Sequence, residues 1–467
     1  MPSTPDLVSL HQSLWQGECT AAHAVEQAIA RAQSPACAGA LVHFTPERAR
    51  EQARRVDAAL AAGAPLPPLA GLAFTVKDLF DVAGELTLAG SRVLADAAPA
   101  AAHAPAVAQL LAAGGSLLGR THMVEFAFSG VGTNPHWPAP VAWDGRYDAP
   151  VGEAGAPCVP GGSSSGAAVS VAAGAAWVGL GSDTGGSVRI PAALNGIVGF
   201  KGTARLVPTA GTVPLSTTLD TVGALTRSVR DAVLAHEVLA ARRVTRAAAP
   251  LSAWRLAVVR TTMLEALDTT VARAFERSLA TLRAAGARIE LIDLPELLDL
   301  PRLTERANFS AVESYAWHRE RITRRAAEYD PRVAQRILRG AEVPAHAYID
   351  LIEGRARWIA RTEAALRGFD AVLSPTTPIV APPLAAVAPA DGRDAAADAA
   401  RDAEFFRVNA LLLRNTGVVN MLDGCALTLP CHAPGEAPVG LMVWAGALRD
   451  DAVLNIGLQI ESALQIQ

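Results

Sequence analysis

A serine follows two glycines and an aspartate in the run GSDTGGSVRIPA, residues 181 to 192. A serine hydroxyl becomes a nucleophile for acyl transfer when a nearby base takes its proton. Glycines allow the backbone to approach a reacting atom closely. The plainer interpretation is that Gly185 and Gly186 form a turn and that Ser187 caps the next helix. This run alone leaves both interpretations open.

A second serine cluster lies upstream, in the run PGGSSSG at residues 160 to 166, directly before an Ala-rich segment. Its three hydroxyls could cap a helix or hold an anion at the helix N-terminus. The spacing Gly162-x-Ser164-x-Gly166 also matches the nucleophile elbow of α/β-hydrolases, but that elbow follows a strand and the preceding PCVP is a poor strand. Ser164 is therefore the weaker candidate nucleophile.

Lys77 is the candidate base, because none of the ten histidines lies near the serine runs with a recognisable acidic partner. It ends the apolar run LAGLAFTV, so we expect it at the tip of a buried strand. Burial favours the neutral amine and lowers the pKa of a lysine. The alternative is a structural lysine paired with Asp78.

Taken together, FTVKDLFDVAG, PGGSSSG and GSDTGGSVRIPAALNGIVGFKGT resemble the amidase signature family. Later stretches such as FDAVLSPTTPIVAPP and PVGLMVWAG extend the resemblance over most of the chain. It implies an α/β fold with a central mixed β-sheet wrapped by helices on both faces. It also implies a triad in which Ser187 is the nucleophile, Ser163 is a middle serine in a cis peptide bond, and Lys77 is the base.

The loop around Ser187 would then form an oxyanion hole from backbone N–H groups, which stabilise the charge of a tetrahedral intermediate. The residues expected to supply these groups are Thr184, Gly185, Gly186 and Ser187. Four further residues are expected to contact the catalytic residues and hold them in position, namely Asp183, Ser164, Ser165 and Arg189.

The sequence shows no repeat and no clear second domain, so with this resemblance we expect one amidase domain over residues 1–467. We expect a helical lead-in over about 1–65, a signature core over about 66–235 and a variable helical segment over about 297–367. Short apolar runs alternating with helical ones favour a mixed or parallel sheet. We interpret the Ala/Asp-rich residues 384–403 as a solvated loop. The Pro- and Gly-rich loop at 130–160 fits no period and is longer than the family usually has there.

Composition narrows the function classes. The formal charge of −4 has no long run of one sign, so we expect neither a nucleic-acid nor a membrane partner. The N-terminus lacks the pattern of a secretory signal, which favours a cytoplasmic location. Five scattered cysteines without a CxxC pair argue against a zinc site or a disulfide framework. His122 and Glu125 alone do not make a metal site, and we expect no metal and no cofactor.

The leading hypothesis is an amidohydrolase that cleaves a carboxamide-type C–N bond in a small amide or urea-derived substrate. The alternatives are a broad aryl acylamidase or carbamate hydrolase, a glutaminase-type subunit of an amidotransferase complex, and a binding protein without turnover. The sequence also leaves open whether the protein forms a homodimer. An arginine of the variable helical segment could grip a substrate carboxylate. The candidates are Arg302, Arg306, Arg319, Arg321, Arg324 and Arg325, although the plainer interpretation is a solvated helix face.

Overall fold

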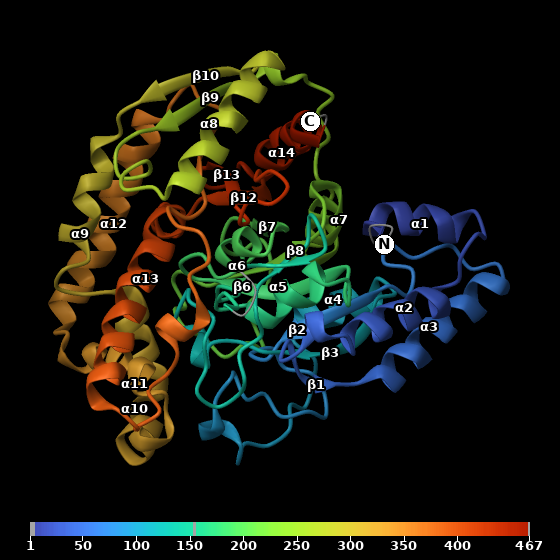
Figure 1. Ribbon diagram of the computed structural model, residues 1–467, viewed down its shortest axis with the longest axis horizontal. Coiled ribbons are helices and arrows are strands. Elements are labelled where there is room, and N and C mark those ends of the chain that lie inside the picture. Colours follow the sequence, from blue (N-terminus) through green and yellow to red (C-terminus); the bar gives the residue numbers. More distant parts are fainter. Residues whose placement is uncertain (1–4, 153–155, 466–467) are drawn as a thin grey trace.

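The computed structural model describes residues 5–152 and 156–465, and an eleven-stranded sheet forms its centre (Figure 1). Its strands lie in the order β1-β3-β2-β6-β8-β7-β12-β13-β11-β9-β10. Their bounds are β1 (Leu41–Phe44), β2 (Ala73–Lys77), β3 (Ser116–Thr121), β6 (Val178–Asp183), β7 (Val198–Lys201), β8 (Thr221–Thr226), β9 (Arg255–Val259), β10 (Arg288–Ile292), β11 (Ala371–Pro375), β12 (Cys425–Pro430) and β13 (Gly440–Ala445). Two short strands, β4 (Trp143–Asp144) and β5 (Ala149–Pro150), pair separately.

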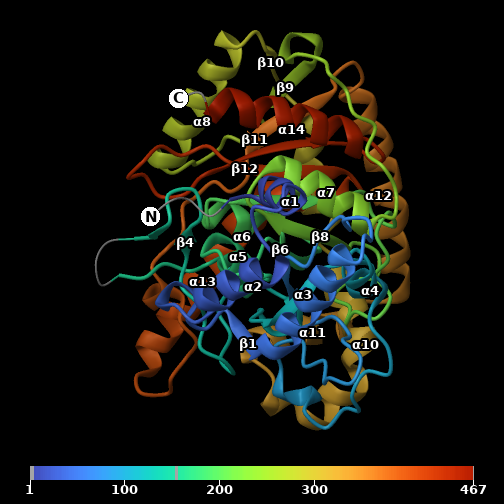
Figure 2. The ribbon, with the colours of Figure 1, turned by 90° about the vertical axis from the view of Figure 1, so that its right-hand side faces the viewer.

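The sheet is mixed. β2 runs parallel to β3 and β6, β9 runs parallel to β10 and β11, and the remaining neighbours are antiparallel. The antiparallel pair β12–β13 connects the two parts of the sheet, because β12 pairs with β7 and β13 pairs with β11. Figure 2 shows the molecule from the side, with β1 near one end of the sheet and β9 and β10 near the other.

The helices that surround the sheet come from the whole described chain. Their bounds are α1 (Leu7–Trp15), α2 (Ala21–Ala32), α3 (Pro46–Ala61), α4 (Pro105–Ala112), α5 (Ser165–Ala172), α6 (Arg189–Leu194), α7 (Val229–Leu239), α8 (Thr269–Ala284), α9 (Leu300–Leu303), α10 (Phe309–Arg325), α11 (Pro331–Leu338), α12 (Ala345–Ala365), α13 (Ala395–Met421) and α14 (Asp450–Gln465). Short 3-10 turns, among them η3 (Glu125–Ala127), lie between them.

Helices cover both faces of the sheet, as the alternation of side chains in β13 shows. Leu441 and Val443 belong to a buried cluster with residues of α7, α8 and α14. Met442 and Trp444 belong to a different cluster, with residues of α12 and α13. The predicted fold class, a central mixed sheet wrapped by helices on both faces, is confirmed.

Most predicted elements are present. The lead-in contains α1, α2 and α3, and residues 300–367 contain α9 to α12. The prediction of a solvated loop over residues 384–403 is wrong at Leu384–Val387, a 3-10 turn with Val387 buried, and again from residue 395 onward, where α13 begins. Asp394 caps that helix by accepting from the N–H groups of Ala396 and Ala397, and alanine is the strongest helix former. The strand β1 was not expected from the sequence.

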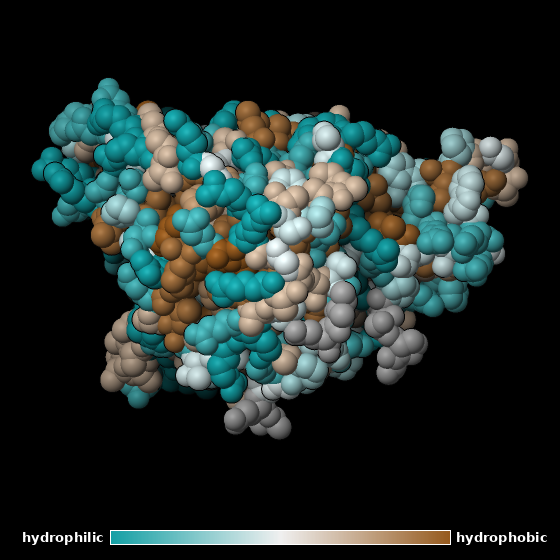
Figure 3. All heavy atoms as spheres, turned by 90° about the horizontal axis from the view of Figure 1, so that it is seen from above, coloured by the Kyte–Doolittle hydropathy of each residue, from teal (hydrophilic) through white to brown (hydrophobic). Residues whose placement is uncertain are grey.

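The surface carries hydrophilic and hydrophobic residues side by side, as Figure 3 shows for the face seen from above. On this face, apolar residues gather to the left of centre, with hydrophilic residues around them. Among the helices of residues 5–152 and 156–465, none combines the length and apolar character needed to cross a bilayer.

Candidate active site

The sequence-predicted residues meet at the carboxyl ends of two neighbouring parallel strands. Lys77 is the last residue of β2, and Asp183 is the last residue of β6. Ligands bind at such strand ends in α/β sheets, because the loops that follow the strands converge there.

Lys77 is fully buried and donates two hydrogen bonds to serine hydroxyls. Its Nζ lies 2.8 Å from Ser163 Oγ and 2.7 Å from Ser182 Oγ. Burial lowers the pKa of the Lys77 amine to about 7, although the carboxylates of Asp220 and Asp183 act in the opposite direction. A substantial neutral fraction at neutral pH is what a general base requires.

Ser163 lies in a tightly packed loop, and the Gly162–Ser163 peptide bond is cis. The Gly162 N–H donates to the carbonyl of Gly130 over 2.8 Å. A Cβ on Gly162 would lie 2.9 Å from the backbone nitrogen of Gly132. Only glycine therefore fits before Ser163.

Ser187 is 3% exposed, and its loop lies beside the Ser163 loop. The Ser164 N–H donates to the Ser187 carbonyl over 3.3 Å. The Ser187 hydroxyl hydrogen-bonds to none of the described residues, so the expected Ser187-to-Ser163 contact is not formed. The Lys77-to-Ser163 contact is formed.

Residues 184–187, which we call the oxyanion loop, offer free donors. Within the described part of the chain, the N–H groups of Gly185, Gly186 and Ser187 donate to no other group. Gly186 has φ +140°, and a Cβ on it would lie 2.3 Å from Thr416 Oγ1. The Thr416 hydroxyl donates to the Gly185 carbonyl over 2.6 Å. The loop therefore has a fixed shape with unused donors, which suits an oxyanion.

Asp183 and Arg189 form a fully buried ion pair behind this loop. Asp183 accepts from Arg189 Nη2 at 2.9 Å and from the Val188 N–H at 3.1 Å. Burial raises the pKa of the Asp183 carboxyl, but the Arg189 guanidinium outweighs burial and holds it at about 2. Asn420 of α13 contacts both partners. The pair ties the start of α6 to the end of β6.

Ser164 and Ser165 have buried hydroxyls that bond to backbone carbonyls. Ser164 Oγ donates to the carbonyl of Ser182 over 3.4 Å, and Ser165 Oγ donates to that of Ser163 over 3.5 Å. No named strand of the described chain leads into Ser164, unlike in a nucleophile elbow. This geometry disfavours the α/β-hydrolase alternative.

Comparison with known proteins identifies the family. A family profile described as Amidase matches residues 23–454. The chain belongs to the amidase family. It is 34% identical to a 2-amino-5-chloromuconic acid deaminase of Comamonas testosteroni, over 89% of this chain and 87% of that protein. It is 31% identical to a glutamyl-tRNA(Gln) amidotransferase subunit of Salinispora arenicola, over 91% of this chain and 90% of that protein.

The solved structures agree with this assignment. A crystal structure of an amidase superposes with a TM-score of 0.84 at 33% identity, covering 98% of this chain and 99% of the other. This amidase is therefore a hydrolase of C–N bonds, and a Ser-Ser-Lys triad is the mechanism of its family.

Several contacts of the amidase site were not expected from the sequence. Ser182 is the second hydroxyl at Lys77, and its position next to Asp183 was the signal that could have found it. Thr416 and Asn420 reach the site from α13. No local pattern distinguishes them from other polar residues of that helix.

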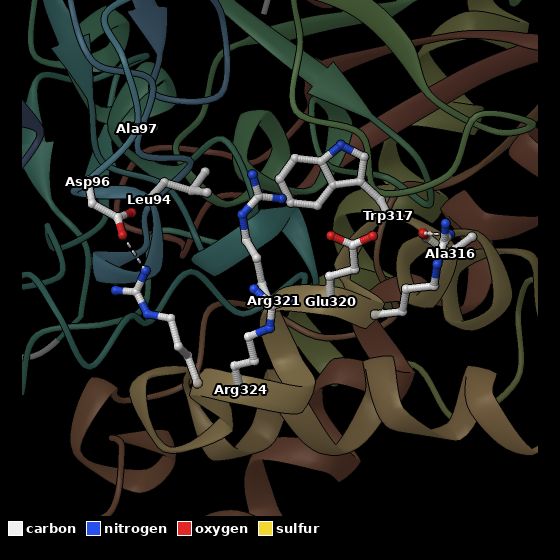
Figure 4. A pocket seen from close by; sticks show the side chains of 10 residues that line it. Leu94, Asp96, Ala97, Ala316, Trp317, Glu320, Arg321 and Arg324 are labelled. Atoms are coloured by element: carbon white, nitrogen blue, oxygen red, sulfur yellow. Dashed lines mark hydrogen bonds and ion pairs between the residues drawn. The ribbon is translucent and has the colours of Figure 1, made fainter.

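The arginines of the variable helical segment lie elsewhere in this amidase. Arg319, Arg321, Arg324 and Arg325 line a surface pocket of about 580 Å³ together with Trp317 (Figure 4). Arg302 and Arg306 line a second pocket of similar volume. Neither pocket has Lys77, Ser163 or Ser187 in its lining.

A different arginine packs against the segment that leads to the Ser163 loop. The Arg336 guanidinium of α11 lies 4.8 Å from the ring centroid of Phe128. One of its terminal nitrogens is buried without a hydrogen-bond partner among the described residues. Phe128 is two residues before Gly130, whose carbonyl holds the N–H of Gly162. Arg336 is thus a half-buried cation with unused hydrogen-bonding capacity, and it packs on a residue close in sequence to the one that holds the Ser163 loop.

Proposed function

We propose that this amidase hydrolyses a small amide that carries a carboxylate, through an acyl-enzyme on Ser187. The observation that carries the proposal is the buried Lys77 amine at 2.8 Å from Ser163 Oγ, beside the loop of Ser187. A binding protein needs no buried lysine and serine pair of this kind.

In the first half of the reaction, Ser187 Oγ attacks the amide carbonyl carbon. Its proton passes to Ser163 Oγ, while Ser163 gives its own proton to the neutral Lys77 amine. The carbonyl oxygen becomes an oxyanion that accepts from the N–H groups of residues 184–187. The C–N bond then breaks, and the proton held by Lys77 returns through Ser163 to the leaving nitrogen.

In the second half, water replaces the amine in the site. Lys77 takes a proton from this water through Ser163, and the resulting hydroxide attacks the acyl carbon. When the ester bond to Ser187 breaks, the same proton returns to Ser187 Oγ. The products are a carboxylic acid and ammonia or an amine.

The carboxylate in the proposed substrate is supported by two observations. The relative from Comamonas testosteroni is named for the deamination of an acid, 2-amino-5-chloromuconic acid. In addition, Arg336 offers a buried guanidinium nitrogen without a partner in the described structure. A guanidinium binds a carboxylate with two parallel hydrogen bonds, so Arg336 rather than the surface arginines is our candidate.

The test is release of ammonia from a panel of primary amides and urea derivatives, half of them bearing a carboxylate. Aryl amides and carbamates are assayed beside them through their amine product. We expect ammonia from the carboxylated members and no turnover in Ser187→Ala, while Ser164→Ala retains activity. Full activity in Ser187→Ala would overturn the assignment of the nucleophile. Amine from aryl substrates alone would favour the acylamidase alternative.

A second candidate is the glutaminase subunit of an amidotransferase, favoured by the 31% identity to such a subunit over 91% of the chain. In that case the protein should release ammonia from glutamine at an appreciable rate only when its partner subunits are added. We propose a cytoplasmic location for the enzyme. Whether it forms a homodimer is tested by light scattering of the purified protein.

A further inference from the structure

The oxyanion loop is held from the side by a carboxylate that the mechanism above does not use. The hydroxyl of Thr184 donates to Asp220 Oδ1 over 2.6 Å. The Asp220 carboxylate also accepts two backbone N–H groups of its own turn, at 3.0 and 3.1 Å. Next to it, the Thr221 hydroxyl donates to the Asp183 carbonyl over 2.8 Å. The turn that ends at Asp220 is therefore fastened to the first residue of the oxyanion loop.

The same turn is also hydrogen-bonded to the variable helical segment. Glu313 of α10 accepts from Ser216 Oγ at 2.6 Å and from the Thr218 N–H at 3.0 Å. It also accepts from the Thr218 hydroxyl, and from the Tyr348 hydroxyl of α12 over 2.6 Å. A continuous chain of hydrogen bonds thus leads from α10 and α12 through the turn to the oxyanion loop.

The pairing of β6 with β8 also brings Asp220 to the end of β6 where Lys77 is bound, because Thr221 pairs with Asp183 and the neighbouring Ser182 accepts from Lys77 Nζ. Two carboxylates, Asp220 and Asp183, act on Lys77 and favour its charged form. Asp183 is neutralised by its buried ion pair with Arg189. Asp220 makes no ion pair with any described residue, and its carboxyl has a pKa raised by burial to about 6. Above that pH, its charge acts on Lys77 without a cationic partner of its own.

We propose that Asp220 is a positioning residue of this active site. It fixes the oxyanion loop through the Thr184 hydroxyl and sets the charge that Lys77 experiences. Glu313 holds the Asp220 turn in place and so couples the variable helical segment to the loop. The proposal rests on the roles of Lys77 and Ser187 given above.

Asp220→Asn is the first test, because it keeps the size and one acceptor oxygen but removes the charge. With this charge gone, the ammonium form of Lys77 is less favoured and the pKa of Lys77 falls. The acidic limb of the kcat/KM profile should then move to lower pH by roughly 0.5 to 1 unit. A residue with a merely structural role would lower the rate or the Tm without moving this limb. An unmoved limb would overturn the electrostatic part of the proposal.

Two further variants test the hydrogen-bond chain. They keep the positioning role testable if Asp220→Asn fails to fold. Thr184→Val removes one hydroxyl and Glu313→Gln removes a charge remote from Lys77. In both variants we expect kcat to fall about 10-fold at nearly constant KM, while the acidic limb of the kcat/KM profile stays at the parental pH. A kcat within about twofold of the parent in both variants would overturn the positioning role.

The controls separate this proposal from the proposed function. Asp57→Asn alters a carboxylate that accepts two N–H groups at the start of α2, outside the hydrogen-bond chain from α10 to the oxyanion loop, and should leave the profile unchanged. Activity in Ser187→Ala would contradict the proposed function itself. Loss of activity in Ser187→Ala with parental behaviour in the Asp220, Thr184 and Glu313 variants would contradict only the present inference.

Discussion

At the scale of single residues, the proposed role of Lys77 as the base predicts how the rate depends on pH. Burial lowers its pKa to about 7, and only the neutral amine can accept a proton. We expect kcat/KM to rise with pH up to about 7 and to level off above it. Lys77→Ala should lose roughly 10²- to 10⁴-fold in kcat. A flat profile across the neutral range in the parent enzyme would contradict this role for Lys77.

Arg336 leads to a prediction about specificity. If its guanidinium binds the substrate carboxylate, Arg336→Met should lower kcat/KM for carboxylated amides by roughly 10- to 100-fold, since a hydrogen bond to a charged group contributes about 1.5–3 kcal/mol. Neutral amides should be affected much less. The measurement compares kcat/KM for matched amides with and without the carboxylate, and Arg324→Met of the surface pocket is the control. Equal losses for both substrates would argue against carboxylate binding by Arg336.

At the scale of elements, the connection from β6 to α6 depends on the glycine at position 186. Gly186→Ala would place a Cβ 2.3 Å from Thr416 Oγ1, in a backbone conformation that L-residues rarely adopt. The loop would have to shift, and we expect kcat to fall by roughly 10²- to 10³-fold, as for loss of an oxyanion donor. Kinetics and Tm of the purified variant check this.

The matched control is Gly435→Ala, because Gly435 has φ +79° and a Cβ added to it would have no heavy atom within 4 Å. This variant places alanine at a positive φ, as Gly186→Ala does, but its Cβ meets no neighbouring atom. It should therefore keep the parental kcat. Parental kcat in Gly186→Ala as well would show that the loop does not need its present shape.

The sequence predicts some elements and residues well because local patterns define them. Lys77 ends an apolar run and Ser187 follows two glycines, so both could be singled out, although their catalytic roles stay predictions. Thr416 and Asn420 reach the site through packing of α13, which no local pattern encodes. The start of α13 was misread because alanine and aspartate are common in solvated loops as well as in capped helices.

At the scale of the whole molecule, a buried carboxyl joins the N-terminal helix to the rest of the protein. Asp231 of α7 accepts from the N–H groups of Leu7 and Val8 at 3.0 and 3.1 Å. Burial, aided by Asp6, raises the pKa of Asp231 from 3.8 to about 7. A raised pKa means that the folded state favours the protonated carboxyl. Its contribution to stability is therefore complete below about pH 4 and is lost as pH rises through about 7.

Asp231→Asn should remove this dependence on pH. We expect the Tm of the variant minus that of the parent to increase between about pH 4 and pH 7, by roughly 1–3 °C, and to be constant above. Scanning calorimetry at several pH values measures the difference. Asp57→Asn is a suitable control because Asp57 accepts two helix N–H groups in the same way but is more exposed. A difference that does not vary with pH would contradict the assignment to Asp231.

The position of β12 and β13 in the middle of the sheet has a consequence for biosynthesis. A ribosome makes β7 and β11 well before it makes their partners at residues 425–445. Until then the nascent chain carries two strands with unpaired backbone groups, a kind of surface that promotes aggregation. Premature termination before Cys425 would therefore leave two half-sheets with no strand to join them.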